Sequence, residues 1–198
     1  MKNIITISRE YGSGGTEIGH LLEKRLGYKY YDKQLISGLA ENLMIPENMI
    51  RQAENSPAKK NIFHEAISFW TKGANDQDKY IFEEQGKFIR KLAENGNCIF
   101  AGRRADYYLK DNENAFHLFF YAPAEKRIKH IMETENLSEE EAVKKIESMD
   151  KMRKSSYEYV TGRTWGDRHN FDRMINTDSC SIEQIVEEIA MLIEGSDR

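Results

Sequence analysis

The residues best suited to chemistry form a glycine-rich stretch near the start of the sequence, residues 8–16, which read SREYGSGGT. Glycine accepts positive φ angles and lets the backbone approach a ligand closely. Consecutive backbone N–H groups at the start of a helix bind an anion, because they lie at the positive end of the helix dipole. We therefore predict a phosphate-binding loop, formed by Arg9, Gly12, Ser13, Gly14, Gly15 and Thr16.

This stretch departs from the usual phosphate loop, which reads G-x-x-x-x-G-K-[ST]. Gly14 and Thr16 match that pattern, but Gly15 stands in the place of the lysine and Arg9 in the place of the first glycine. The alternative interpretation is a flexible turn between a strand and a helix. The residues around Ser13 do not form G-x-S-x-G, so no serine nucleophile is predicted.

A second group of candidates follows an apolar strand in the middle of the chain, where the sequence reads Gly102-Arg103-Arg104. Two guanidinium groups at the carboxyl edge of a sheet suit a phosphate or a carboxylate, because arginine donates two hydrogen bonds at once. The alternative is a pair of surface arginines that form salt bridges with acidic neighbours, and such salt bridges contribute little to the stability of the fold.

Four further charged residues lie after strands or in polar segments. Arg127 follows Pro123 at the start of a predicted helix, and Asp150 and Arg153 are three residues apart, on one helical face. Asp32 follows a short strand and can also be interpreted as a helix cap. Each is a solvated charge if taken singly, and their joint placement favours a binding site.

The elements that must position these residues alternate between strand and helix. Runs rich in β-branched or apolar residues predict strands at 3–8, 28–32, 97–101, 116–121 and 173–177. Between about 33 and 95 no strand is predicted, and the pattern predicts helices at 33–44, 46–54, 61–72 and 77–95. We interpret it as a helical insertion that forms part of a binding cleft, because it is too long for an ordinary crossover.

Further helices are predicted from Pro123 to about 134, after the capping box that starts at Ser138, and at 181–194. This alternation predicts a three-layer α/β domain with a mostly parallel sheet. Ligands bind at the carboxyl ends of the strands in such sheets. The polar residues at those ends are 9–16, Asp32, 102–106 and 177–178.

Composition excludes several classes of protein. The net charge of −4 and the pI near 5.8 argue against a nucleic-acid polymer as partner. No apolar run reaches the ~18 residues needed to span a bilayer, so no membrane partner is predicted. We expect no secretory signal at the start. Two cysteines form neither a disulfide framework nor a zinc site, and we expect a cytoplasmic protein.

Together these residues resemble the cytidylate-kinase-like proteins, a branch of the nucleoside monophosphate kinases within the phosphate-loop kinase fold. The resembling segments follow the family's order and span almost the whole chain: 5–19, 30–36, 101–109, 120–132, 150–167 and 170–178. The resemblance implies a single domain, 1–198. Its parts are a core at about 1–32, 96–145 and 170–198, a helical acceptor-binding insertion at about 33–95 and a lid at about 146–169.

The resemblance also implies the reaction: transfer of the γ-phosphoryl group of ATP, with Mg²⁺, to CMP or a similar small-molecule nucleotide. The phosphate loop would hold the donor, with the Thr16 hydroxyl near Mg²⁺. The implied catalytic residues are Arg103, Arg127 and Arg153. The implied acceptor-binding residues are Asp32, Arg103, Arg104, Asp106 and Asp150.

Three positions depart from cytidylate kinases. Gly15 replaces the loop lysine, Arg104 replaces the aspartate of a G-R-D motif unless Asp106 substitutes, and an acceptor-site arginine is missing at Ser37 and Gly38. A lost donor to developing charge typically costs ~10²–10³ in rate. The basic residues that could restore the charge are Arg9, Lys151 and Arg163.

Three functions therefore stay open. The first is a kinase for a nucleotide or another small metabolite. The second is a nucleotide-binding module of kinase fold that does not catalyse. The third is an interaction protein with an empty cleft, against which the glycine loop and the clustered arginines weigh. The acceptor base and the oligomeric state are open too.

Overall fold

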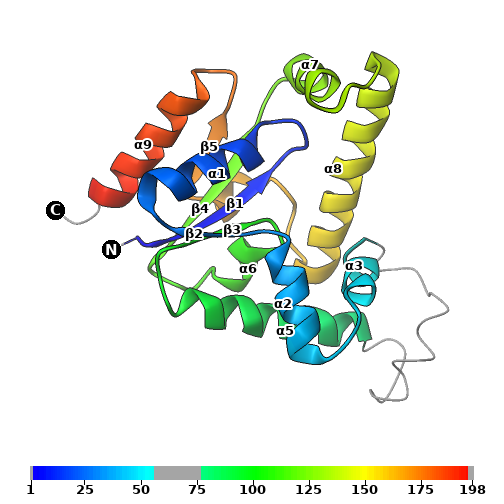
Figure 1. Cartoon of the computed structure of the whole chain (residues 1–198), viewed down its shortest axis with the longest axis vertical. Coiled ribbons are helices and arrows are strands. Elements are labelled where there is room, and N and C mark those ends of the chain that lie inside the picture. Colours follow the sequence, from blue (N-terminus) through cyan, green and yellow to red (C-terminus); the bar gives the residue numbers. More distant parts are fainter. Residues whose placement is uncertain (1, 56–76, 196–198) are drawn as a thin grey trace.

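The computed structural model describes residues 2–55 and 77–195, and within them the chain is built around a five-stranded parallel sheet (Figure 1). The strand order is β2-β3-β1-β4-β5. The strands are β1 (Ile4–Arg9), β2 (Lys29–Tyr31), β3 (Cys98–Ala101), β4 (Ala115–Tyr121) and β5 (Arg173–Asn176). All five strands predicted from the sequence are confirmed, and so is the parallel α/β architecture.

The central strands are apolar because both faces of the sheet are covered. In β1, Ile5 pairs with Ile99 of β3 and with Phe116 of β4. A strand that is buried on both faces reads as a nearly continuous apolar run, as β1 and β4 do. The carboxyl ends of these strands meet at one edge of the sheet, which is the edge that carries Arg9.

One face of the sheet is covered by α1 (Gly15–Leu26) and α9 (Ile182–Gly195), which pack side by side (Figure 1). Their apolar stripes repeat at helical spacing, as expected for helices that cover a sheet. The core on this face includes Ile5, Ile7, Ile18, Leu22, Ile99, Leu118, Phe120, Ile185, Val186 and Ile189. This packing fixes the start of α1 against the end of β1.

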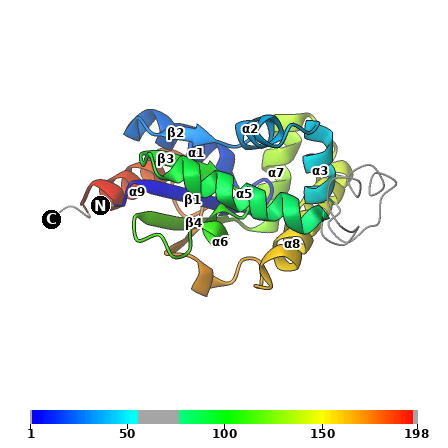
Figure 2. The ribbon, with the colours of Figure 1, turned by 90° about the horizontal axis from the view of Figure 1, so that it is seen from below.

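The opposite face is covered by α5 (Gln77–Ala93) and the short α6 (Ala105–Tyr108) (Figure 2). Their core includes Ile4, Tyr31, Leu35, Ile89, Ala93, Phe100, Ala105 and Leu109. The short helix α6 was not predicted from the sequence. It follows β3 directly and turns the chain away from the sheet edge.

The predicted helical insertion has a small core of its own, where α2 (Gln34–Leu43) and α3 (Glu47–Asn55) pack with α5. The buried members are Ile36, Leu39, Ala40, Ile50, Ala53, Ile81 and Phe82. The predicted helix at 61–72 lies outside the described residues. The two short helices therefore stand beside the sheet edge and can wall a cavity there.

The long helix α8 (Glu139–Thr161) follows α7 (Ala124–Glu135) and runs from α7 toward α3 (Figure 1). The capping box predicted at Ser138 is confirmed, because Ser138 Oγ accepts from the Glu141 N–H and the Glu141 carboxylate accepts from the Ser138 N–H. The helix is unbroken from the cap to Gly162, whose φ of 66° ends it. A 3₁₀ turn, Arg168–Asn170, follows. Much of the predicted lid is thus the second half of α8, and the lid boundaries stay a prediction.

None of the described helices is both long enough and apolar enough to cross a membrane.

Candidate active site

The glycine loop joins β1 to α1, and its backbone conformation needs glycine at two positions. Gly12 and Gly14 have φ angles of 80° and 76°. A Cβ atom at Gly12 would also lie 3.0 Å from the carbonyl oxygen of Arg127. Ser13 Oγ closes the turn by donating to the Glu10 carbonyl oxygen at 2.9 Å.

The start of α1 is left without a side-chain cap, since Gly14 occupies the N-cap position. The first N–H groups of a helix have no partner inside the helix, so here they face the space in front of the loop. A groove lies there, lined by the loop, by the first turns of α1 and by α7. This arrangement suits a phosphate, as the sequence predicts.

Arg9, the last residue of β1, lies against two glycines. A Cβ atom at Gly15 would be 2.9 Å from Arg9 Cβ, and one at Gly102 would overlap Arg9 Nη1. The Nε atom of Arg9 is sealed from solvent and has no hydrogen-bond partner among the described residues. Burial lowers the pKa of the Arg9 guanidinium, and the carboxylate of Asp32 partly opposes that shift.

Arg153 reaches the same place from α8. Its Nη1 atom donates to the Arg9 carbonyl oxygen at 2.8 Å, and its guanidinium lies over the Tyr11 ring, 5.3 Å from the centroid. Burial, and then the charge of Arg9, lower the pKa of Arg153 to about 10. In the described part of the chain neither arginine has an ion-pair partner, so two like charges lie close together and are opposed only at longer range, for example by the carboxylate of Asp32.

Arg127 and Asp150 hold the glycine loop from outside. Asp150 accepts from the Tyr11 N–H at 2.7 Å and from Arg127 Nη1 at 2.6 Å, and Arg127 Nη1 also donates to the Tyr11 carbonyl oxygen at 3.0 Å. Arg127 Nε lies 3.4 Å from a carboxylate oxygen of Glu10. Neither Arg127 nor Asp150 lines the groove or the cavity described next. The contacts of both residues hold the glycine loop in position.

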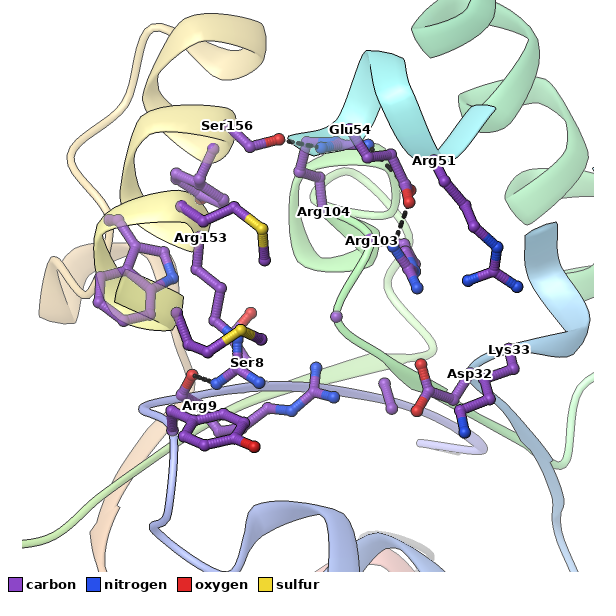
Figure 3. A pocket seen from close by; sticks show the side chains of 17 residues that line it. Ser8, Arg9, Asp32, Lys33, Arg51, Glu54, Arg103, Arg104, Arg153 and Ser156 are labelled. Carbon is purple, nitrogen blue, oxygen red and sulfur yellow. Dashed lines mark hydrogen bonds and ion pairs between the residues drawn. The ribbon is translucent and has the colours of Figure 1, made fainter. Parts of the chain in front are cut away.

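A cavity of about 370 Å³ opens at the carboxyl ends of β1, β2 and β3, between α3 and α8 (Figure 3). Arg9, Arg103 and Arg153 point into it from three sides. Six cationic side chains and two carboxylates line it: Arg9, Lys33, Arg51, Arg103, Arg104 and Arg153, with Asp32 and Glu54. This excess of positive charge favours an anionic ligand.

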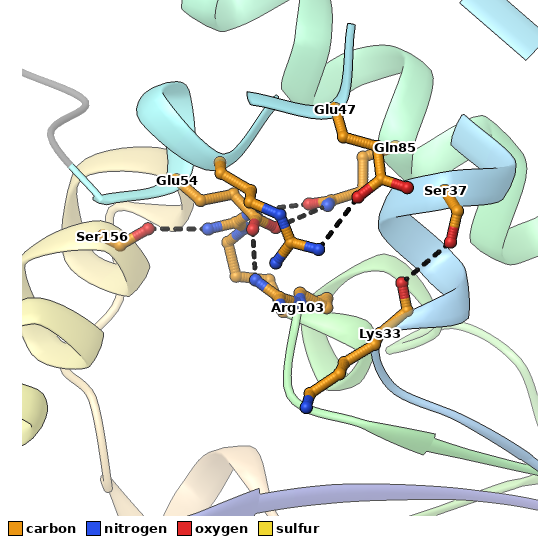
Figure 4. Close-up of polar contacts among 9 residues, drawn as sticks. Lys33, Ser37, Glu47, Glu54, Gln85, Arg103 and Ser156 are labelled. Atoms are coloured by element: carbon orange, nitrogen blue, oxygen red, sulfur yellow. Dashed lines mark hydrogen bonds and ion pairs between the residues drawn. The ribbon is translucent and has the colours of Figure 1, made fainter. Parts of the chain in front are cut away.

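The two arginines after β3 differ in what they contact. Arg103 pairs with Glu54 (Figure 4), and 23% of its side chain is exposed. Arg104 is buried: it donates to Ser156 Oγ at 2.7 Å (Figure 3) and to Gln85, lies 3.5 Å from Glu54, and stacks over Phe82. Both arginines line the cavity, but the guanidinium of the predicted acceptor-binding residue Arg104 is surrounded by protein partners, whereas Arg103 is partly exposed to the cavity.

The backbone at this turn is unusual, because Gly102, Arg103 and Arg104 all have positive φ angles, of 73°, 56° and 58°. Non-glycine residues in this region cost of order 1–3 kcal/mol each and persist only where the surroundings hold them. Here Glu54 holds both arginines. The turn sends the two side chains to opposite environments, one open and one buried.

Three charged lining residues escaped sequence reasoning: Lys33, Arg51 and Glu54. Arg51 and Glu54 lie on α3, in a stretch that has no motif, and Arg51 enters the cavity while it pairs with Glu47 at 2.9 Å. The missing arginine near Gly38 has a steric reason, since a Cβ there would be 2.8 Å from the Phe88 ring. For Arg51 and Glu54, the signal available in the sequence was the polar face of α3.

Asp106 lies away from the cavity lining, beneath the end of β1, and is 2% exposed. It accepts from Ser8 Oγ at 3.2 Å and from the Tyr157 hydroxyl at 2.7 Å. Burial raises the pKa of its carboxyl group, although these hydrogen bonds oppose the shift. This geometry ties α8 to β1, and it places the predicted acceptor residue behind the site.

The predicted residues therefore separate into four groups. Arg9, Asp32, Arg103 and Arg153 are brought together around the cavity, and residues 12–16 form the groove beside it. Arg127 and Asp150 brace the loop, and Arg104 and Asp106 lie in buried networks. Lys151 and Arg163 line neither space; Arg163 donates to Asn170 Oδ1 and lies over the Tyr107 ring.

A parallel α/β sheet whose first strand leads through a glycine loop into the first helix, with a ligand cavity at the carboxyl edge, is the architecture of the phosphate-loop kinases. The chain belongs to the cytidylate kinase-like family, whose sequence profile matches residues 4–179.

The chain is similar to several known proteins. The chain is 27% identical over 196 residues to the cytidylate kinase of Thermoplasma acidophilum, covering 98% of this chain and 94% of that protein. It is similar to the crystal structure of an uncharacterized protein from Eubacterium ventriosum, with a TM-score of 0.73, 26% identity, and coverage of 96% and 98%. Shikimate kinase from Acinetobacter baumannii, solved in complex with shikimate, shares the fold, with a TM-score of 0.51, 15% identity, and coverage of 98% and 94%.

Proposed function

We propose that the protein transfers the γ-phosphoryl group of ATP to a small acceptor that carries a phosphate, with a nucleoside monophosphate such as CMP as the first choice. One observation carries the proposal: the groove beside the glycine loop and the cationic cavity share Arg9, Tyr11 and Arg153. A donor along the loop and an acceptor in the cavity would meet at two guanidiniums. Family membership supports the same class of reaction.

The chain's residues would act by positioning and by charge. An oxygen of the acceptor phosphate forms a bond to the γ-phosphorus of ATP, the bond from that phosphorus to the β–γ bridging oxygen breaks, and its electron pair leaves with ADP. Arg9, Arg103 and Arg153 would neutralise the charge spread over the transferred group. No proton needs to be removed from a dianionic acceptor, so no general base is required.

Mg²⁺ fits this site as a partner of the donor phosphates. Across the described ranges no group of three or more His, Cys, Asp and Glu side chains could hold a metal. Mg²⁺ in kinases is bound mainly by phosphates, water and one or two protein oxygens. The exposed Thr16 hydroxyl at the start of α1 would contribute the protein oxygen, and the ion would supply further neutralisation of the phosphate charge.

The first test is ADP release from Mg-ATP with CMP, dCMP, UMP, AMP and GMP as acceptors and a buffer blank. The expected result is turnover with one pyrimidine monophosphate and its loss in Arg103→Ala, since Arg103 is the cavity arginine that Glu54 leaves partly exposed. Lys144→Met, on the outer surface of α8, is the matched control. ADP release that no acceptor stimulates would overturn the kinase proposal.

A second candidate is a nucleotide-binding module without catalysis, because the loop lacks its lysine and Arg104 is held by protein partners. This candidate predicts saturable ATP binding with no turnover. A ligand at 100 times its Kd should add ~2.7 kcal/mol to the free energy of unfolding. Steady turnover, with one ADP formed for each acceptor molecule phosphorylated, would exclude the non-catalytic candidate.

A further inference from the structure

We propose that Arg9 takes over the role of the missing loop lysine, so that the first and the penultimate positions of the phosphate loop have exchanged their residues. In the usual pattern the first position is glycine and the penultimate position is lysine. Here the first is Arg9 and the penultimate is Gly15. The inference rests on the proposed function, since it names the group that acts on the transferred phosphoryl group.

The exchange is reciprocal because the two positions share one space. A Cβ atom at Gly15 would be 2.9 Å from Arg9 Cβ and 3.1 Å from Arg9 Cγ, closer than side-chain atoms normally approach. A lysine at position 15 therefore does not fit while Arg9 is present. Glycine at 15 is what an arginine at 9 requires, and its φ is not among the positive angles of the loop.

The side chain of Arg9 continues along the floor of the cavity. It passes the α-carbon of Gly102, where a Cβ atom would overlap Nη1, and heads toward Asp32 (Figure 3). Two glycines thus make room for one arginine, one beside its stem and one beside its guanidinium. This places the charge between the glycine loop and the cationic cavity, where the donor and the acceptor would meet.

The Arg9 side chain is half-buried between the groove and the cavity, and among the described residues the carboxylate of Asp32 is an opposite charge that acts on it without forming an ion pair. Its Nε atom is sealed and unpartnered, no described carboxylate lies within ion-pairing distance, and the like charge of Arg153 is adjacent. A charge that is partly removed from water and has no ion-pair partner is costly unless a ligand supplies the partner. An anion at the boundary of groove and cavity would satisfy both arginines, and a phosphoryl group offers the oxygens to do so.

The other basic residues near the site do not have this placement. Lys151 and Arg163, which the sequence also allows as replacements, line neither the groove nor the cavity. Arg103 lines the cavity but not the groove, and it is paired with Glu54. Of the described cationic side chains, Arg9 and Arg153 alone line both spaces, and only Arg9 belongs to the loop.

The test is a mutant cycle of Arg9→Gly, Gly15→Lys and the double variant, which restores the usual loop. ATP, ADP and inorganic tripolyphosphate are titrated by calorimetry, and turnover is measured with the acceptor found active. Arg9→Met is added because it keeps the stem that packs on Gly15. Lys144→Met is the control, and circular dichroism with thermal melting establishes that each variant is folded.

The expected result is non-additivity. Arg9→Met and Arg9→Gly weaken tripolyphosphate and ATP binding about 10- to 100-fold, the value of one lost charge-assisted contact, and lower kcat by about 10²–10³. Gly15→Lys alone is also impaired, because it collides with Arg9. The double variant binds and turns over better than either single variant, although the Phe120 ring, 3.2 Å from the new Cβ, must shift slightly.

Two results would overturn the inference, and they differ in what else they exclude. If the wild type binds ATP and Arg9→Met binds it equally well with the same kcat, Arg9 has no such role and the proposed function stands. If the folded wild type binds neither ATP nor tripolyphosphate, the proposed function fails as well.

Discussion

The buried contact between Glu54 and the two arginines after β3 lends itself to a quantitative test, by the change Glu54→Gln. The substitution keeps the size of the side chain and removes its charge. Glu54 Oε1 accepts from Gln85 Nε2 at 2.8 Å, and its other oxygen accepts from Arg103. A glutamine must turn its amide N–H₂ toward one of these donors, so at least one hydrogen bond becomes a donor–donor contact.

The size of the effect follows from burial. The side chains of Glu54 and Arg104 are 4% and 6% exposed, and their charged atoms lie 3.5 Å apart. Removing one partner of a buried ion pair typically costs about 3–5 kcal/mol. We take the lower end, because Arg103 is 23% exposed and water in the cavity screens it. At ~2–4 °C per kcal/mol for a chain of this size, the Tm falls by roughly 6–12 °C.

The assay is equilibrium unfolding in urea, followed by circular dichroism and supported by thermal melting. Glu47→Gln is the matched control, because Glu47 lies on the same helix and pairs with Arg51, but the two side chains are 44% and 45% exposed. An exposed pair at this spacing contributes about 0.3–0.5 kcal/mol. The difference between the two variants isolates burial from helix position.

A Glu54→Gln variant that unfolds within about 0.5 kcal/mol of the wild type, the range typical of surface substitutions, would refute this reasoning. It would mean that Arg104 is stabilised by Ser156, Gln85 and Phe82 without the carboxylate. The left-handed turn at Arg103 and Arg104 would then need another explanation.

Three other substitutions test separate parts of the structure. Asp106→Asn should abolish a pH dependence of the free energy of unfolding. Because burial raises the pKa of Asp106 in the folded protein, its carboxyl group stabilises the fold below pH 3.8, which is the ordinary pKa of the group. That stabilisation is lost as the pH rises through the folded-state pKa. Urea unfolding at several pH values should show the variant gaining on the wild type as pH rises. Gly102→Ala should lose ~1–2 kcal/mol, because its φ of 73° is left-handed, and calorimetry should show weaker ATP binding as Arg9 is displaced. Ser138→Ala should lose ~1 kcal/mol of unfolding free energy with unchanged ATP affinity, since the capping box is remote from the cavity.

Each of these has a contradicting outcome. Parallel pH profiles for Asp106→Asn and the wild type would mean that the carboxyl group is not perturbed by burial. Normal ATP affinity in Gly102→Ala would separate Arg9 from the nucleotide. An effect of Ser138→Ala on ATP affinity would tie the start of α8 to the site.

The sheet and the loop could be predicted because their causes are local. The apolar runs around Ile5 and Phe116 are strands by composition, the glycines after Arg9 stop β1, and Ser138 begins α8 through a contact three residues away. The carboxyl-edge rule then places the polar residues after each strand at one edge. The rule applies to Arg9, Asp32 and Arg103, and the structure has all three around one cavity.

What each of those side chains touches was decided only by the tertiary structure. Adjacent arginines have the same local sequence, yet Arg103 faces the cavity and Arg104 is buried, because the turn at Gly102 is left-handed and Glu54 approaches from 49 and 50 residues away. Arg153 finds the Arg9 carbonyl across 144 residues. No periodicity or motif encodes such contacts, since they arise when separate helices pack on one sheet and exclude each other's volume.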